Sequence, residues 1–171
     1  LQDGKDILHV CLSSGISGVL NSAMIAKADL EERYPERKIL IVDSLGASSG
    51  YGLLMDRLAD LRDEGKPLEE VYDFAMKNRL KVHHWFFSTD LTFYVRGGRI
   101  SKSLAFAGTM LQIKPVLAVT DGEIQLLGKA RGSKMGNNLL AQEIQKAGGV
   151  DFSRPVLLGY TGLSDALLQK Y

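Results

Sequence analysis

The sequence has a single cysteine, and it shows neither a signal-peptide pattern nor a segment of transmembrane length. The single cysteine, Cys11, excludes an intrachain disulfide, makes a zinc cluster very unlikely and favours a reducing compartment. No apolar run reaches transmembrane length, and no signal-peptide pattern opens the chain. These absences predict a cytoplasmic protein with no integral membrane span.

An excess of charge of one sign is lacking too. The net charge is +1, and Lys and Arg are scattered without forming a basic stripe, so we expect no nucleic acid partner. The 171 residues are 45% hydrophobic and 24% charged, which is an ordinary globular composition. This length predicts one large domain or two small lobes with a buried core.

The motifs of common catalytic and nucleotide sites are also missing. Residues 15–19 resemble a nucleophile elbow, but Val19 stands where the last glycine should be. The chain has no P-loop G-K-[ST], and no G-x-G-x-x-G follows a strand. No Ser, His and Asp are spaced as a triad, and no carboxylate pair or metal motif stands out. We therefore expect no catalytic residue, metal or cofactor.

The chain does contain a strand that opens onto a helix through serines and glycines, at residues 7–23 (ILHVCLSSGISGVLNSA). The apolar run suits a strand buried on both faces, and the later residues have helical spacing. Between them, hydroxyls and unobstructed N–H groups lie at the positive end of the coming helix, which is typical of a carboxylate or phosphate site. The residues that would bind are Ser13, Ser14, Gly15, Ser17 and Gly18. A well-capped turn with no ligand is an equally open interpretation.

The alternation of strand and helix then repeats. A second buried strand at residues 39–43 (ILIVD) leads into Ser44, and apolar faces at helical spacing follow at 51–61 and 68–75. Buried strands alternating with amphipathic helices predict a parallel, doubly wound α/β lobe over residues 1–82, with its ligand site at the C-terminal ends of the strands.

From about His83 the pattern changes, which predicts a second α/β lobe with a mixed sheet over residues 83–171. The expected elements are a strand at 85–87, a short helix from Asp90 capped by Gly97-Gly98, a helical face at 104–111, a hairpin of 115–120 and 123–129 joined by Asp121-Gly122, a helix ending at Gly148-Gly149 and a strand at 155–160.

Two arginines are the best candidates among the cations. Arg99 and Arg131 each lie beside a glycine, where a ligand meets little obstruction, and arginine suits bidentate oxyanion recognition. Solvated surface charge remains the alternative for each. His83 and His84 adjoin a strand, so they point to opposite faces and cannot both serve one site. His9 is expected in the core.

Five blocks occur in the order found in the DegV family. They are residues 7–23, 42–54 (VDSLGASSGYGLL), 91–101 (LTFYVRGGRIS), 108–117 (GTMLQIKPVL) and 129–134 (KARGSK). The resemblance implies two lobes with a long-chain fatty acid in an apolar tunnel between them and its carboxylate at the Ser-Gly loop. In some members the protein is the acyl-binding subunit of a fatty acid kinase, and it presents the carboxylate to a separate ATP-binding chain.

The resemblance also assigns residues. Ser14, with Gly15 behind it, matches the serine that holds the carboxylate through its hydroxyl and N–H, and Arg99 and Arg131 match arginines near the head group. The family's N-terminal segment with a Ser/Thr-bearing loop, and its C-terminal segment with a His and a Gly-Pro-Gly turn, are not found here. The chain opens without Met and stops within an expected helix from Ser164, so we expect a fragment of a longer protein.

We therefore predict a bacterial lipid-binding subunit that is not itself an enzyme and acts with a separate kinase. The chief alternative is a small-molecule kinase subunit of the dihydroxyacetone kinase type, which would want a histidine facing the pocket. A third is a nucleotide- or phosphate-binding regulator, which the lack of a P-loop disfavours.

Overall fold

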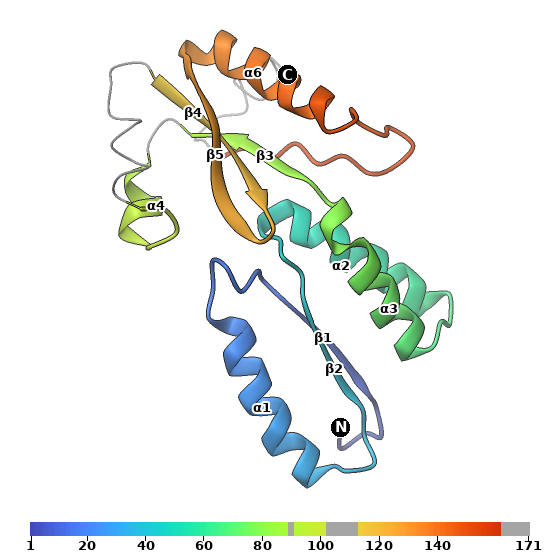
Figure 1. Ribbon diagram of the computed structural model, residues 1–171. Helices are drawn as coiled ribbons and strands as arrows, with labels where there is room; N and C mark the ends of the chain where they lie inside the picture. Colours follow the sequence, from blue (N-terminus) through green and yellow to red (C-terminus); the bar gives the residue numbers. More distant parts are fainter. Residues whose placement is uncertain (89–90, 102–112, 162–171) are drawn as a thin grey trace.

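A computed structural model describes residues 1–88, 91–101 and 113–161 (Figure 1). The elements up to Lys81 are β1 (Ile7–Cys11), α1 (Val19–Arg33), β2 (Ile39–Asp43), α2 (Ser48–Asp63), α3 (Leu68–Asn78) and a 3₁₀ turn (Arg79–Lys81). The elements from His84 onward are β3 (His84–Phe87), α4 (Thr92–Arg96), β4 (Ile113–Thr120), β5 (Glu123–Arg131) and α6 (Gly132–Lys146). The fold is therefore α/β with two separate sheets.

The first sheet is parallel, as predicted. β1 and β2 pair in register from Ile7 opposite Ile39 to Cys11 opposite Asp43. Figure 1 shows α1 on one face of this pair and α2 with α3 on the other. The core lies on the α2 and α3 side, where seven buried residues pack together: Val10, Val42, Leu54, Leu58, Leu61, Val71 and Ala75.

The predicted burial of β1 and α1 is only partly correct. Only Val10 and Cys11 of β1 are buried, and His9, expected in the core, is exposed. No residue of α1 is buried, and the exposed fraction of Met24 is 48%. The reason is that α1 packs on only two described strands, which are too narrow to cover its apolar face.

The second sheet consists of β3, β4 and β5 in that order, and every described pair is antiparallel. The Asp121-Gly122 turn is confirmed, with φ of 50° and 87°, as the turn at the end of the β4–β5 hairpin requires. The sheet was expected to be mixed, because residues 155–160 read as a further strand. That expectation is wrong for the described residues, since 155–160 form no regular element and Val156 to Leu158 are exposed.

The short helix before Gly97-Gly98 is confirmed as α4, and Gly98 has the positive φ of 71° that ends it. Leu91 and Ile100, on either side of α4, are buried against Leu117 of β4. The helical face expected at 104–111 and the helix from Ser164 lie outside the described residues.

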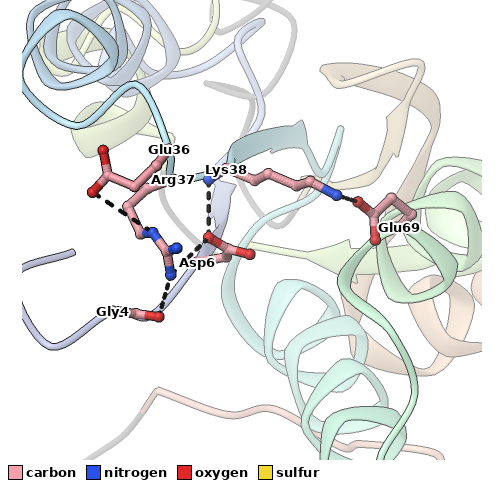
Figure 2. Close-up of polar contacts among 6 residues, drawn as sticks. All are labelled: Gly4, Asp6, Glu36, Arg37, Lys38 and Glu69. Carbon is pink, nitrogen blue, oxygen red and sulfur yellow. Dashed lines mark hydrogen bonds and ion pairs between the residues drawn. The ribbon is translucent and has the colours of Figure 1, made fainter.

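Polar contacts tie the first sheet together at the end remote from the Ser-Gly loop (Figure 2). Asp6, just before β1, accepts a hydrogen bond from the Lys38 N–H at 2.9 Å and lies 3.9 Å from the Arg37 guanidinium. The Lys38 ammonium in turn pairs with Glu69 in the first turn of α3. The Lys38–Glu69 pair is exposed, and exposed ion pairs contribute little stability.

Candidate functional site

The Ser-Gly loop (residues 12–18) lies at the C-terminal edge of the parallel sheet, beside the loop that follows β2. Ser13 N–H donates to the Gly46 carbonyl at 2.9 Å, and Ser44 N–H donates to the Cys11 carbonyl at 3.2 Å. The two loops are therefore joined at the edge of the sheet where ligands of doubly wound folds bind.

Ser13, one of the predicted ligand-binding residues, faces the interior. Its side chain is fully buried, and its Oγ donates to the Gly122 carbonyl at 2.6 Å and accepts the Gly15 N–H at 3.2 Å. Gly122 is the second residue of the hairpin turn, whose end reaches the first sheet in Figure 1. Ser13 therefore fastens the second sheet to the Ser-Gly loop, and its hydroxyl is not directed to solvent.

Ser14 is exposed, and both of its donors are held by one carboxylate. Its Oγ donates to Asp43 Oδ2 at 2.5 Å, and its N–H donates to Asp43 Oδ1 at 3.2 Å. Asp43 Oδ1 also accepts the Leu45 N–H at 3.1 Å, which supports the left-handed φ of 51° at Leu45. Ser14 therefore holds a carboxylate of the protein itself through its hydroxyl and N–H.

The three N–H groups that follow Ser14 in the loop, from Gly15 to Ser17, are used internally. The N–H groups of Ile16 and Ser17 donate to the Ser13 carbonyl at 3.2 and 3.0 Å. Ser17 Oγ accepts the Val19 N–H at 3.3 Å, which is the local capping role of the alternative interpretation. Each backbone N–H from Ser13 to Ser17 therefore has an acceptor, and Ser14 is the exposed residue whose donors could be exchanged.

Of the two predicted arginines, the structure brings one to the loop. Arg99 is exposed, and its Nε donates to the Ile16 carbonyl at 3.1 Å. Its position is fixed by its own N–H, which donates to the Tyr94 carbonyl of α4 at 2.8 Å. A guanidinium thus lies next to the exposed side of the Ser-Gly loop, as an anion site requires.

Arg131 lies elsewhere. It ends β5 and pairs with Ile113, whereas Glu123 at the other end of β5 adjoins the turn that contacts Ser13. An extended strand of this length spans roughly 25 Å, so Arg131 is not beside the Ser-Gly loop. The structure does not bring it to the head-group position that the resemblance implies.

His84 forms the other joint between the two sheets. Its Nε2 accepts the Ala47 N–H at 3.3 Å, and its ring occupies a space that exists because residues 46 and 50 are glycines. A Cβ built on Gly50 would lie 2.1 Å from Nε2. Burial lowers the pKa of His84, with smaller opposing effects from the backbone of Ala47 and Val82. His84 is therefore a structural residue that packs against α2.

Sequence reasoning missed both Asp43 and His84 as parts of this region. Asp43 is the last residue of the ILIVD strand, at the edge where the Ser-Gly loop was already expected, so its position carried a usable signal. For His84 the signal was weaker, because only the glycines at 46 and 50 hint at a close approach.

A pocket of about 350 Å³ lies between the 3₁₀ turn, the second sheet and α6. Its lining includes charged and aromatic side chains, among them Arg79, His83, Trp85, Glu143 and Lys146, and it does not include Ser14. His83 and Trp85 stack there with ring centroids 4.8 Å apart. Apolar side chains, among them Leu45, Leu80 and Leu127, also contribute, so the lining is mixed.

Residues 1–88, 91–101 and 113–161 contain no group of three or more His, Cys, Asp or Glu side chains that could hold a metal ion. None of their helices is long and apolar enough to cross a membrane. Cys11 is buried, and burial, followed by the charge of Asp43, raises the pKa of its thiol.

Known proteins resemble the chain in sequence and in structure. A DegV domain-containing protein of Clostridium perfringens is 40% identical over 147 residues, covering 85% of this chain and 50% of the relative. The Streptococcus pneumoniae Fatty Acid Kinase (Fak) B3 protein, loaded with linoleic acid, is 34% identical with a TM-score of 0.77, covering 84% of this chain and 52% of that one.

A DegV family protein of Eubacterium eligens, loaded with heptadecanoic acid, is 28% identical with a TM-score of 0.76, covering 85% of this chain and 53% of that one. The chain spans about half the length of the relatives it matches. The family model described as DegV family matches residues 1–170. The chain belongs to the DegV family.

Proposed function

We propose that this chain binds a long-chain fatty acid, with the carboxylate at Ser14 beside Arg99, and presents it to a separate kinase for acyl phosphate formation. One observation carries the proposal: the Ser14 hydroxyl and N–H already hold a carboxylate, that of Asp43. The fatty acids bound by the similar proteins of S. pneumoniae and E. eligens support it.

The affinity would come mostly from the tail. Burying an acyl chain contributes roughly 0.8 kcal/mol for each CH₂ group, so a long tail supplies more than the head group can. The head-group contacts fix the orientation of the acid. Such a division of roles needs no catalytic group on this chain, and we propose that it acts in the cytoplasm as a binding subunit.

We do not favour the dihydroxyacetone kinase alternative. It needs a histidine at the ligand, but His9 lies within β1, His83 stacks on Trp85 and His84 is held against Ala47.

The direct test of the head group is Ser14→Ala. We expect the variant to bind acid more weakly by on the order of 1.5–3 kcal/mol, the range for hydrogen bonds to a charged group, while its melting curve barely changes because Ser14 is exposed. The measurement is a titration with dansyl-undecanoic acid. The matched control is Ser17→Ala, because the Ser17 hydroxyl accepts only the local Val19 N–H among its described contacts. Unaltered affinity in a folded Ser14→Ala protein would remove Ser14 from the site.

The second test separates presentation from catalysis. The chain alone should hydrolyse no ATP, since the sequence carries no P-loop, and acyl phosphate should form only after an ATP-binding fatty acid kinase chain is added. Arg99→Ala should lower this coupled rate more than it lowers acid binding, because the guanidinium would stabilise charge as the phosphoryl group arrives.

Arg131→Ala is the matched control, because it removes the same charge at the far end of β5. Trapping with hydroxylamine measures the acyl phosphate, and dansyl-undecanoic acid measures binding on the same variants. Equal losses of rate and binding in Arg99→Ala would assign this arginine to holding the ground state. ATP turnover by the isolated chain would overturn the non-enzyme proposal.

A further inference from the structure

The Asp43 carboxylate occupies the donors that a fatty acid would need. Its two oxygens accept the Ser14 hydroxyl at 2.5 Å and the Ser14 N–H at 3.2 Å. A serine hydroxyl has one proton to donate, so it cannot donate to Asp43 and to a second carboxylate at once. The N–H groups of Ser13, Gly15, Ile16 and Ser17 are satisfied internally. Binding of an acid at Ser14 therefore has to involve Asp43.

We propose that Asp43 is a specificity-determining residue that competes with the ligand for Ser14, so that the acid binds together with one proton held between the two carboxyl groups. This inference rests on the proposed function. It adds that the site binds the acid together with a proton in preference to the ionised carboxylate alone.

The argument is electrostatic. An acid bonded to Ser14 Oγ can approach Asp43 Oδ2 directly, because both oxygens then lie within about one hydrogen-bond length of the same hydroxyl. Two carboxylates this close repel each other, and such pairs commonly share one proton instead of both being ionised. The proton belongs to the pair, so it is not assigned to either oxygen.

The surrounding charges do not cancel this repulsion. Arg79 donates to the backbone carbonyl of Asp43 at 2.7 Å. Arg99, the cation on the ligand side, is exposed and is therefore screened by solvent. On the hairpin, Asp121 and Glu123 flank the turn residue Gly122 and add negative charge.

Two other titratable groups lie near this pair, and burial disfavours the charged form of each. It lowers the pKa of His84, whose Nε2 accepts the Ala47 N–H at 3.3 Å. Burial and the charge of Asp43 raise the pKa of the Cys11 thiol. The variants of Asp43 therefore identify the group that holds the proton.

The variant Asp43→Asn tests the proposal while preserving the loop. The amide oxygen can still accept the N–H groups of Ser14 and Leu45, and the amide NH₂ can donate to Ser14 Oγ. The Ser14 proton then becomes available to a ligand carboxylate, and the repulsion is gone. Asp56→Asn, on the exposed side of α2, is the charge-matched control.

The experiment titrates each protein with dansyl-undecanoic acid at about pH 7 and about pH 9. Uptake of a proton predicts that the Kd of the unmodified protein rises with pH, by at most about tenfold per pH unit. Asp43→Asn should show little pH dependence and should bind more tightly than the unmodified protein at the higher pH, whereas Asp56→Asn should behave like the unmodified protein. Calorimetry of the unmodified protein in two buffers of different ionisation enthalpy should show about one proton taken up, independently of any variant.

Saturable binding with a Kd that does not change with pH, or with no proton uptake, would overturn the role of Asp43 and leave the proposed function standing. The same pH dependence in Asp43→Asn as in the unmodified protein would also overturn it. Absence of saturable binding by the unmodified protein at both pH values would contradict the proposed function itself, and the inference with it.

Discussion

Gly50→Ala is expected to lower the free energy of unfolding by roughly 1–3 kcal/mol, the range for overpacking a filled space. The added Cβ would lie 2.1 Å from His84 Nε2 and 2.5 Å from its Cδ2, so the imidazole has to leave its place against α2. The hydrogen bond from Ala47 N–H to Nε2 is lost with it. Since this contact joins the two sheets, the effect should be global and cooperative.

The matched control is Gly52→Ala in the same helix, where an added Cβ meets nothing within 4 Å. Alanine is a better helix former than glycine, so this variant should raise the free energy of unfolding by about 0.5–1 kcal/mol. Urea unfolding of the two variants gives the comparison. Shifts of the same sign and size would show that the His84 joint does not support the fold.

Gly15→Ala should weaken acid binding by about tenfold and destabilise the protein by roughly 1–3 kcal/mol. Its Cβ would lie 2.6 Å from the Gly122 carbonyl oxygen, the same atom that accepts the Ser13 hydroxyl. Because that neighbour is backbone, it cannot rotate away, and the hairpin and the Ser-Gly loop have to separate. Ser14, which directly precedes Gly15, would then lose its position.

Gly18→Ala is the control for this variant, since a Cβ at residue 18 meets nothing within 4 Å and the φ of −78° suits alanine. It should leave both affinity and melting temperature nearly unchanged. Dansyl-undecanoic acid titrations and thermal melts of both variants decide the matter. If Gly15→Ala bound acid as well as Gly18→Ala does, the contact between hairpin and loop would have no part in forming the site.

Local pattern was enough to predict most of the described elements. The apolar runs form β1 and β2, and the residues at helical spacing in 51–61 include the buried residues of α2. Asp121-Gly122 forms the hairpin turn. In each case the determining physics lies within one turn or one strand. The predicted strand at 155–160 failed because strand formation depends on a pairing partner, which the apolar run itself does not specify.

The candidate site was less predictable because its contacts are long-range. Ser14 meets Asp43 across 29 residues, Ala47 meets His84 across 37, and Ser13 meets Gly122 across 109. Composition and spacing identified Ser13 and Ser14 as polar groups at a strand end but could not distinguish the buried hydroxyl from the exposed one. Arg99 and Arg131 were equally good candidates from the sequence, because each lies beside a glycine. The structure distinguishes them, since Arg131 lies at the end of β5 that is remote from the hairpin turn.

The most direct test of the central claim, fatty acid binding, is denaturing mass spectrometry of the small molecules released from the purified protein. If the chain binds lipid as proposed, saturated or monounsaturated acids of about C14 to C18 should be recovered, because tails of this length supply most of the binding free energy. The Ser14→Ala protein, prepared in parallel, should release less. Recovery of nucleotides or sugars alone would contradict the claim.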